Sequence, residues 1–366
     1  MTRVLIVDDS ALMRRHLKEI LEGAGFETRS ARNGTEALEA LEADPPDVIT
    51  LDINMPEMDG LTCLARLMTV RPTPVVMVSS LTEKGAEATF EALALGAVDF
   101  IHKPEGTISL NVARIEREIL DKVRAASRAR IRRSLGLQGR RRAASLQGAR
   151  KTERPVAQAT LDPQSLGVVL VGVSTGGPGT LEDILPALPA DFPWPVVVAQ
   201  HMPGSFTTVF ARRLDTLCAL TVIEASSQMP LEPGTVYIAK GDADVVVGRR
   251  ATRLVVNPMP SADQYPWHPS VGRLVESALH ALPAERLVGV LLTGMGDDGA
   301  AAMTELRQRG GKTIAQDEES SVIFGMPGEL VRRGGADVVL PASRIAGQLC
   351  GWLGLDKGVH HGTRQR

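Results

Sequence analysis

Residues 168–177 read VVLVGVSTGG, a short β-branched run that leads directly into a glycine-rich turn. The run predicts a fully buried strand, and apolar residues at helical spacing from about Thr180 to Leu188 predict a helix after the turn. Ser174 is therefore expected on a strand-to-helix turn, where small neighbours let a reactant approach the backbone. Because backbone N–H groups at a helix N-terminus can stabilise an oxyanion, this position suits a serine nucleophile.

The same alternation of apolar runs and helical patterns extends from about Leu166 to Leu353 and predicts a doubly wound parallel sheet. The expected strands are Val168–Val171, Val196–Gln200, Thr221–Glu224, Val236–Ile238, Leu287–Leu292, Lys312–Ala315 and Asp337–Leu340. A hairpin is expected from Asp244–Val247 and Leu254–Val256, joined by Gly248-Arg249-Arg250.

Three residues with complementary chemistry follow three of these strands, namely Ser174, His201 and Asp298. A serine nucleophile, a histidine base and an orienting carboxylate form the acyl-transfer arrangement, which is recognised by roles and not by order in the chain. Each residue also has a structural interpretation. Ser174 could cap a helix in competition with Thr180, His201 could be an ordinary structural histidine, and the aspartate could serve a turn.

The stretch around Ser174 matches the spacing of one of three known glycine-containing motifs. Its G-x-S-x-G spacing matches the nucleophile elbow of α/β-hydrolases, but that fold places its acid before its histidine. A dinucleotide fingerprint needs G-x-G-x-x-G, which is absent, and a phosphate-binding P-loop needs Gly-Lys-Ser/Thr where Pro178 follows Gly177. Both nucleotide interpretations are therefore excluded.

The first 123 residues show a second β/α alternation, which also predicts a doubly wound parallel sheet. The expected strands are Val4–Val7, Glu27–Ser30, Val48–Leu51, Val75–Val78 and Asp99–Ile101. The polar residues that follow them are Asp8, Asp9, Asp52, Ser79 and Lys103. Three carboxylates that converge on one sheet edge repel one another unless a hard cation such as Mg²⁺ neutralises them. A lysine and a hydroxyl opposite them suit a transferred phosphoryl group, although any one of these residues alone could be a solvated loop residue.

Length and composition favour a soluble protein of the cytoplasm. The chain has 366 residues, 43% of them hydrophobic, and a net charge of -2, which together allow two or three globular domains. Its three scattered cysteines argue against a disulfide framework or a zinc site and for a reducing compartment. The N-terminus has no secretory pattern, and no apolar run approaches the roughly 20 residues that span a bilayer.

The segment between the two alternating regions is strongly basic. From Arg124 to Arg154 it holds eleven Lys or Arg and one acidic residue. A nucleic-acid or anionic-membrane patch is one interpretation. A flexible inter-domain linker is the preferred one, because no aromatic residue interleaves the basic side chains.

Four motifs of the first region carry a family resemblance. They are Val7-Asp8-Asp9-Ser10, residues 51–60 (LDINMPEMDG), Ser79-Ser80 and Lys103-Pro104. They resemble the receiver domain of two-component response regulators, and the resemblance implies that Asp52 accepts a phosphoryl group from a histidine kinase. The implied Mg²⁺ ligands are Asp8, Asp9, Asp52 and the Asn54 carbonyl. The implied phosphoryl contacts are Ser79 and Lys103, and Phe100 matches the family's aromatic switch position.

The second region resembles the chemotaxis protein-glutamate methylesterase family (CheB). The motifs are residues 172–177, 200–202, 268–271, 292–300, 315–317 and 324–327. The resemblance implies that Ser174 is the nucleophile, His201 the general base and Asp298 the orienting carboxylate, with oxyanion N–H groups near Thr175 and Met295. The implied substrates are glutamate methyl esters, and also glutamine amides, on methyl-accepting chemoreceptors. No cofactor is expected in this domain, and no nucleic acid or membrane insertion is expected.

Together the resemblances imply two doubly wound α/β domains, a flavodoxin-like receiver at 1–123 and a Rossmann-like methylesterase at 165–355. A basic linker at 124–164 and a tail at 356–366 complete the chain. The receiver is expected to pack over the esterase cleft until Asp52 is phosphorylated. A response regulator with a non-enzymatic output module, or an esterase that acts outside chemotaxis, remains an alternative.

The chain departs from the family pattern at two places. The family often has a proline and a histidine in the stretch that here reads Ala239–Asp244, and an aspartate where this chain has Gly272. We expect neither departure to touch the proposed triad, and both to affect the substrate groove or the domain packing.

Overall fold

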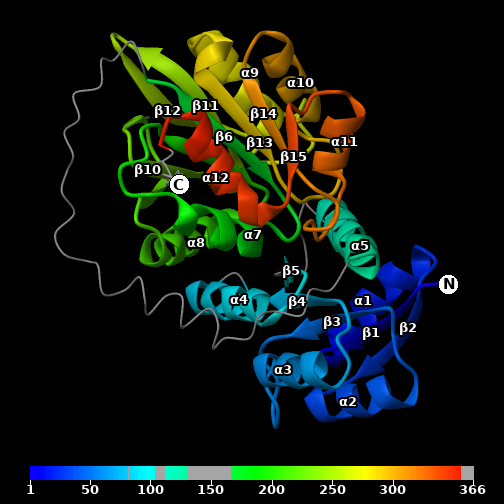
Figure 1. Ribbon diagram of the computed structural model, residues 1–366. Coiled ribbons are helices and arrows are strands. Elements are labelled where there is room, and N and C mark those ends of the chain that lie inside the picture. The colour runs from blue at the N-terminus through cyan, green and yellow to red at the C-terminus, as the bar shows by residue number, and fades with distance from the viewer. Residues whose placement is uncertain (81, 104–111, 130–165, 356–366) are drawn as a thin grey trace, which may run out of the picture.

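The computed structural model describes residues 1–80, 82–103, 112–129 and 166–355. They form two α/β units, each built on one parallel sheet (Figure 1). Most of the basic segment, Pro104 and the tail after residue 355 lie outside the described residues. Within the described part of the chain, no helix combines the length and apolar character needed to cross a membrane.

The N-terminal unit contains a five-stranded sheet in the flavodoxin-like order β2-β1-β3-β4-β5. Its strands are β1 (Arg3–Val7), β2 (Glu27–Ala31), β3 (Val48–Asp52), β4 (Val75–Ser79) and β5 (Asp99–His102). Its helices are α1 (Ala11–Gly23), α2 (Gly34–Ala43), α3 (Gly60–Val70), α4 (Glu83–Leu95) and α5 (Val112–Ser127). All five expected strands are confirmed to within one residue at each end. Helix α5 continues to Ser127, so the first residues of the basic segment are helical.

Strand residues of this unit alternate between two covered faces. Leu5 and Val7 pack in the cluster that contains α2, α3 and α4, whereas Val4 and Ile6 pack with α1 and α5. A parallel sheet needs this double cover because both of its faces are apolar. Gly60 lets α3 start close to the acceptor strand, since a Cβ at this position would lie 2.1 Å from the carbonyl oxygen of Asp52.

The C-terminal unit contains a seven-stranded parallel sheet in the order β15-β14-β13-β6-β7-β10-β8. Its strands are β6 (Val168–Val173), β7 (Val196–Gln200), β8 (Thr221–Ala225), β10 (Thr235–Ala239), β13 (Leu287–Leu291), β14 (Lys312–Gln316) and β15 (Val338–Leu340). Its helices are α7 (Gly177–Ile184), α8 (Gly204–Leu217), α9 (Val271–Ala281), α10 (Ala300–Gln308), α11 (Met326–Arg332) and α12 (Ala342–Trp352), with short 3-10 helices η2 (Leu185–Ala187) and η3 (Ala284–Arg286). Helices α7, α8 and α12 cover one face, and α9, α10 and α11 cover the other. The doubly wound α/β prediction is confirmed for both units, and each expected strand of this sheet is present to within two residues.

The hairpin forms a separate antiparallel sheet, and its turn was predicted in the wrong place. Strands β11 (Ala243–Arg250) and β12 (Arg253–Pro260) pair with the short β9 (Met229–Pro230). The expected turn residues 248–250 are instead paired with β12, and the chain reverses at residues 251–252, where Ala251 has a φ of 53°. A two-residue turn with positive φ fits the twist of a hairpin. In this hairpin the positive φ is adopted by Ala251, and Gly248, which was expected in the turn, lies inside the paired strand.

Helix α7 begins earlier than the apolar pattern indicated. It starts at Gly177, with Pro178 in its first turn, where proline is tolerated because its missing N–H needs no partner. Gly176 before it has a φ of 78°, a left-handed conformation that favours glycine. The result is that the helix starts three residues after Ser174.

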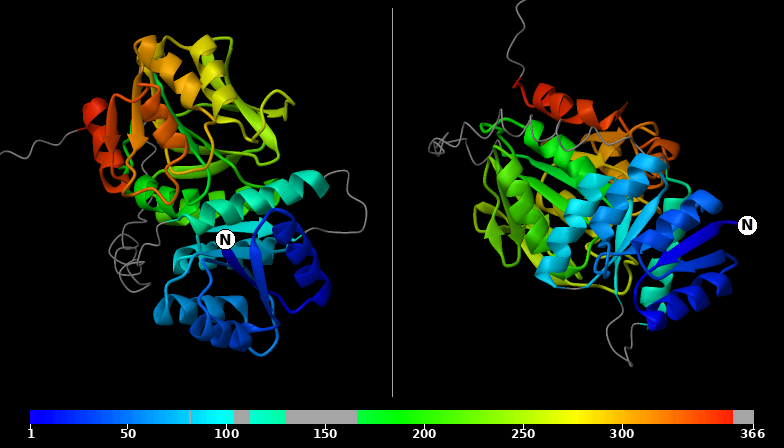
Figure 2. Two further views of the ribbon diagram at one scale, coloured as in Figure 1. Left: turned by 90° about the vertical axis from the view of Figure 1, so that its right-hand side faces the viewer. Right: turned by 90° about the horizontal axis from the view of Figure 1, so that it is seen from below.

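The two units pack directly against each other. Helix α4 lies against α7 and α8, and α5 runs along the boundary (Figures 1 and 2). The contact is aromatic at its centre, because Phe100 stacks on Phe206 with ring centroids 4.4 Å apart and Phe90 stacks on Phe210 at 5.1 Å. An ion pair between Glu83 and Arg212 also joins α4 to α8. One hydrophobic cluster therefore continues from the N-terminal unit into the C-terminal unit.

Candidate active site and phosphoacceptor site

Ser174, His201 and Asp298 lie at one edge of the C-terminal sheet. They follow the neighbouring strands β6, β7 and β13, at the point where the strand order reverses and ligands of such sheets bind. Backbone hydrogen bonds hold these ends together: the N–H of His201 donates to Val173 at 3.1 Å, and the N–H of Ser174 donates to Thr293 at 3.0 Å. The structure thus brings the three predicted residues to one place.

His201 and Asp298 form a direct pair. Nε2 of His201 lies 2.9 Å from Oδ2 of Asp298, and both side chains are about nine-tenths buried. The other ring nitrogen, Nδ1, is buried and makes no hydrogen bond with any described residue. Nδ1 is therefore the ring nitrogen that is open to exchange a proton with a reacting group.

Asp298 is held by four donors. Besides His201, these are the N–H groups of Val271 (2.8 Å) and Gly272 (3.0 Å) and the hydroxyl of Ser270 (3.2 Å). Burial by itself raises the pKa of Asp298, but the hydrogen bond and charge of His201 and the two N–H groups outweigh it, so the pKa lies below its ordinary value. An ionised Asp298 can orient His201 and stabilise its protonated form.

Ser174 is half-buried, and its hydroxyl forms no hydrogen bond with another described residue. It does not cap α7, whose N-cap is Gly176, and Thr180 does not cap it either, because its hydroxyl donates back to the Gly176 carbonyl at 3.0 Å. The loop after β13 closes tightly on Ser174, since a Cβ on Gly294 would lie 2.7 Å from the Cβ of Ser174. No Ser174–His201 hydrogen bond joins these described residues, and such bonds often form only with substrate present.

Two backbone N–H groups are free beside Ser174. Neither Thr175 N nor Met295 N donates to another described backbone or side-chain group. Thr175 follows Ser174 directly. Met295 follows Gly294, which packs closely against Ser174. Unpaired N–H groups in this position can receive a developing oxyanion. Asp297, the neighbouring carboxylate, is exposed, in contrast to Asp298.

The N-terminal unit reaches the residue next to Ser174. The hydroxyl of Thr175 donates to Oδ2 of Asp99 in β5 at 2.7 Å, and both residues are buried. Oδ1 of Asp99 accepts from the N–H of Phe100 at 2.7 Å and lies 3.5 Å from Nζ of the partly buried Lys122. Sequence reasoning missed this contact, and nothing in the local pattern of either residue indicates it.

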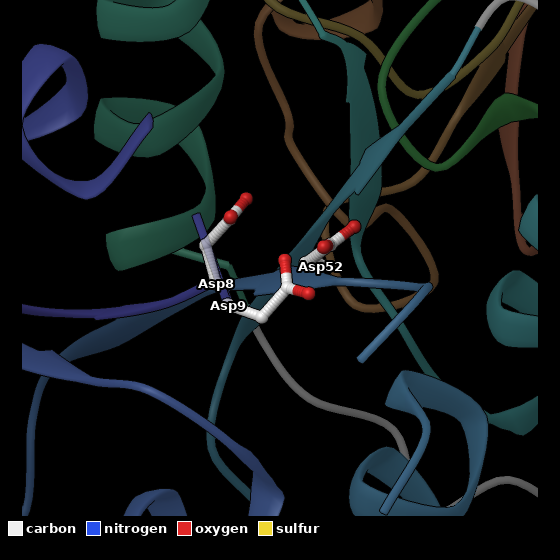
Figure 3. Close-up of side chains that lie close together, drawn as sticks. All are labelled: Asp8, Asp9 and Asp52. Atoms are coloured by element: carbon white, nitrogen blue, oxygen red, sulfur yellow. The ribbon is translucent and has the colours of Figure 1, made fainter. Parts of the chain in front are cut away.

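The acidic residues of the N-terminal unit converge as expected (Figure 3). Oxygens of Asp8, Asp9 and Asp52 all lie within 4.8 Å of one another, and Asp8 and Asp52 are fully buried. Nζ of Lys103 donates to Oδ2 of Asp52 at 2.7 Å and forms an ion pair with Oδ2 of Asp8 at 3.2 Å. That buried Asp8 oxygen accepts no hydrogen bond from any described residue. Burial, and next the charge of Asp8, raise the pKa of Asp52 above its ordinary value although Lys103 opposes them. A buried oxygen without a donor and a cluster of carboxylates fit a small hard cation.

The remaining predicted residues of this site lie around the cluster. The N–H of Asn54 donates to Oδ1 of Asp52 at 3.3 Å. Ser79 is buried at the end of β4, where its hydroxyl donates to the carbonyl of Gly85 at 3.1 Å, and no hydrogen bond joins it to Asp52 among the described residues. Phe100 is buried and turned toward the C-terminal unit, where it stacks on Phe206.

The expectation that neither sequence departure touches the triad was wrong for Gly272, whereas Asp244 reaches the triad only through Ser270. Gly272 donates its N–H to Asp298, and Asp244 accepts the N–H of Ser270 at 2.8 Å. The contacts arise because α9 points its N-terminus at Asp298. Ser270 caps this helix by accepting the N–H of Arg273 at 3.3 Å. A serine directly before an apolar helical pattern is a start signal that could have placed the helix end here.

Comparisons with known proteins identify the family of each unit. The family described as "CheB methylesterase" matches residues 169–349, and the family described as "Response regulator receiver domain" matches residues 4–114. A Rhodospirillum rubrum protein named "Protein-glutamate methylesterase/protein-glutamine glutaminase 3" is 74% identical over the full length of both chains. A relative in Rhodopseudomonas palustris with the same type of name is 52% identical over 97% of this chain and 99% of its own.

A solved structure is also similar. The methylesterase catalytic domain of Thermotoga maritima CheB is 39% identical and aligns with a TM-score of 0.49, covering 50% of this chain and 97% of that domain. The two matched families cover the N-terminal and C-terminal units in the order seen in the structure. The chain belongs to the CheB methylesterase family, with a response regulator receiver domain preceding its methylesterase domain.

Proposed function

We propose that this chain is a phosphorylation-regulated protein-glutamate methylesterase that also deamidates glutamine, with methyl-accepting chemoreceptors as its substrates. The observation that carries the proposal is the His201–Asp298 pair, which lies at the same sheet edge as Ser174 and in which Nδ1 of His201 bonds to no described residue. The names of full-length relatives at 74% and 52% identity support the same reaction.

In the proposed reaction, Ser174 Oγ attacks the ester carbonyl while His201 Nδ1 takes its proton. The N–H groups of Thr175 and Met295 bind the oxyanion, and Asp298 stabilises the protonated His201. The tetrahedral intermediate collapses as His201 returns the proton to the departing methanol. Water, deprotonated by His201, then attacks the acyl-enzyme. The bond between the acyl carbon and Ser174 Oγ breaks as His201 returns the proton to Oγ, which releases glutamate and restores the enzyme. With a glutamine substrate the leaving group is ammonia, and the steps are otherwise the same.

We also propose that Asp52 accepts a phosphoryl group from a histidine kinase. The carboxylates of Asp8, Asp9 and Asp52, with the carbonyl of Asn54, would hold Mg²⁺, which neutralises charge around the phosphoryl oxygens. Lys103 already lies against Asp52 and would contact that group. Ser79 would have to turn from its present carbonyl acceptor to do the same.

Regulation in this proposal acts through the contact between the two units. Phosphorylation adds charge and acceptor oxygens at Asp52 and so favours a different packing of the receiver. In this proposal the packing of the unphosphorylated protein limits access to Ser174. The hydrogen bond from Thr175 to Asp99 supports this role for the contact between the units. The proposed domain limits remain 1–123, 124–164, 165–355 and 356–366, and the proposed location is the cytoplasm.

The test is methanol release from methylated chemoreceptor, with and without a small-molecule phosphodonor. We expect no release by Ser174→Ala, and stimulation of the wild type but not of Asp52→Ala. If wild type releases no methanol from any receptor, a non-enzymatic output module replaces this proposal. If deletion of residues 1–150 leaves esterase activity unchanged or lower, inhibition by the receiver is the wrong description.

A further inference from the structure

Asp244 is a completely buried carboxylate that the proposed reaction does not use. It belongs to β11, and its Oδ1 accepts from Nδ1 of His268 (2.9 Å) and the N–H of Ser270 (2.8 Å). Its Oδ2 pairs with Arg273 (2.6 Å) and accepts the N–H of Ala262 at 3.3 Å. Burial alone raises the pKa of Asp244, but these donors outweigh it, so the pKa lies below its ordinary value.

All four donors come from one stretch, residues 262–273, which runs from the end of β12 into the first turn of α9. A buried carboxylate needs partners to offset its lost hydration, and here the partners fix a loop that has no regular structure of its own. Asp244 is therefore the point at which this stretch is attached to the hairpin sheet.

The same stretch supplies the support of Asp298. Apart from His201, the donors to the Asp298 carboxylate among the described residues are the Ser270 hydroxyl and the N–H groups of Val271 and Gly272. Ser270 is the link between the two carboxylates, because its N–H bonds to Asp244 and its hydroxyl bonds to Asp298. Asp244 and Asp298 thus hold the start of α9 from two sides.

Trp267, in the same stretch, lies beside His201. The two rings are nearly parallel, at 7°, with centroids 6.1 Å apart. A Cβ on Gly296 would approach the Trp267 ring to 2.9 Å, so this ring fills the space up to the loop that carries Asp298. The stretch therefore contacts both members of the His201–Asp298 pair.

We propose that Asp244 is a positioning residue for the esterase reaction, which holds residues 267–272 so that Asp298 and His201 keep their working geometry. This inference rests on the proposed function. Asp244 acts through the groups it holds and touches neither the substrate nor the reacting atoms. The two departures from the family pattern then form one arrangement. At position 272, where the family often has an aspartate, a side chain would place its Cβ 3.3 Å from Oδ1 of Asp298. This chain has glycine there and carries a buried carboxylate on Asp244, which is separated from Asp298 by Ser270.

The test is Asp244→Asn in the full-length chain, which keeps the shape of the side chain and removes its charge. We expect kcat for methanol release to fall about tenfold, because the transition state would lose support equivalent to roughly one charge-assisted hydrogen bond. KM should stay within about twofold of the wild-type value. The acidic limb of the pH profile of kcat/KM should move to lower pH, because a less firmly positioned Asp298 stabilises protonated His201 less well. Among the described residues, the charged or titratable groups that face this network are His268, Arg273, Asp298, His201, Tyr265 and Glu276.

Asp337→Asn is the matched control. Asp337 also accepts a backbone N–H, from Thr313 at 2.8 Å, and pairs with an arginine, Arg307 at 2.7 Å. It is exposed and directly precedes β15 at the edge of the seven-stranded sheet, outside the hairpin sheet that contains Asp244. This variant should lower the melting temperature and leave kcat and the acidic limb unchanged. His268→Gln removes a second member of the Asp244 network, keeps Asp244 itself, and serves if Asp244→Asn does not fold.

The inference would be overturned if Asp244→Asn had the wild-type kcat and an unmoved acidic limb, because Asp244 would then only support the fold. If Asp244→Asn does not fold, the same outcome in His268→Gln would overturn it. A kcat loss as large in Asp337→Asn would overturn it equally, because the effect would follow from general destabilisation. If wild type releases no methanol at all, the proposed function fails first and this inference fails with it.

Discussion

Replacement of Asp99 by alanine should raise the activity of the unphosphorylated enzyme. Asp99 is the receiver residue that binds Thr175, the neighbour of the proposed nucleophile, through a hydrogen bond of 2.7 Å. Only 7% of Asp99 and 5% of Thr175 are exposed. In the variant, the Thr175 hydroxyl has no acceptor while the two units are packed, whereas water can satisfy it once they separate.

The size of the effect follows from the cost of that unmet hydrogen bond. Leaving a buried polar group without its partner costs about 1–3 kcal/mol, and the cost applies to the packed arrangement alone. The ratio of separated to packed molecules should therefore rise about 5- to 150-fold. Lys122 also loses a partner, but it lies within the receiver and loses it in both arrangements, so this cost largely cancels. The basal rate should rise by up to that factor, limited by the fully stimulated rate.

The assay is steady-state methanol release without phosphodonor, followed by the same measurement with it. Asp99→Ala should show a higher basal rate, the same stimulated rate and hence a smaller ratio. Glu83→Gln is the control, because it breaks a largely exposed ion pair with Arg212 in the same interface and should change the basal rate less than about twofold. A wild-type basal rate in Asp99→Ala, with normal stimulation, would show that this contact does not restrain the enzyme.

Three further outcomes are expected. Removal of Mg²⁺ with EDTA should abolish stimulation by phosphodonor and leave the basal rate of methanol release, as Asp52→Ala should. The pKa of Asp298 lies below its ordinary value, so the stability that the ionised carboxylate contributes is present above about pH 4 and is lost as the pH falls through its folded-state pKa. The melting temperature of Asp298→Asn should therefore fall less steeply below about pH 4 than that of the wild type. An unchanged slope would contradict this. Burial raises the pKa of Cys63 to about 11 and of Cys218 to about 12, so a thiol reagent at pH 8 should label neither in the folded protein and both after unfolding in guanidinium.

The strands and the edge at which the candidate residues gather could be predicted from the sequence. Buried parallel strands are continuous apolar runs, and the residue after each run must lie at the carboxyl edge of the sheet. Ser174, His201 and Asp298 follow three such runs, and Asp8 and Asp52 follow two others, so their convergence needed only the correct fold class. The turn of the hairpin was misplaced because glycine also occurs inside paired strands, as Gly248 does.

The sequence by itself therefore determined the two α/β units, the strand ends and the residue types available there, because strand and helix periods are local properties of the chain. Only the tertiary structure decided that Asp99 binds Thr175 and that Asp244 holds the stretch supporting Asp298. The first contact joins residues 76 positions apart in different α/β units, and the second joins a hairpin to a helix N-terminus. Such contacts depend on how whole elements pack, and no local periodicity encodes that packing.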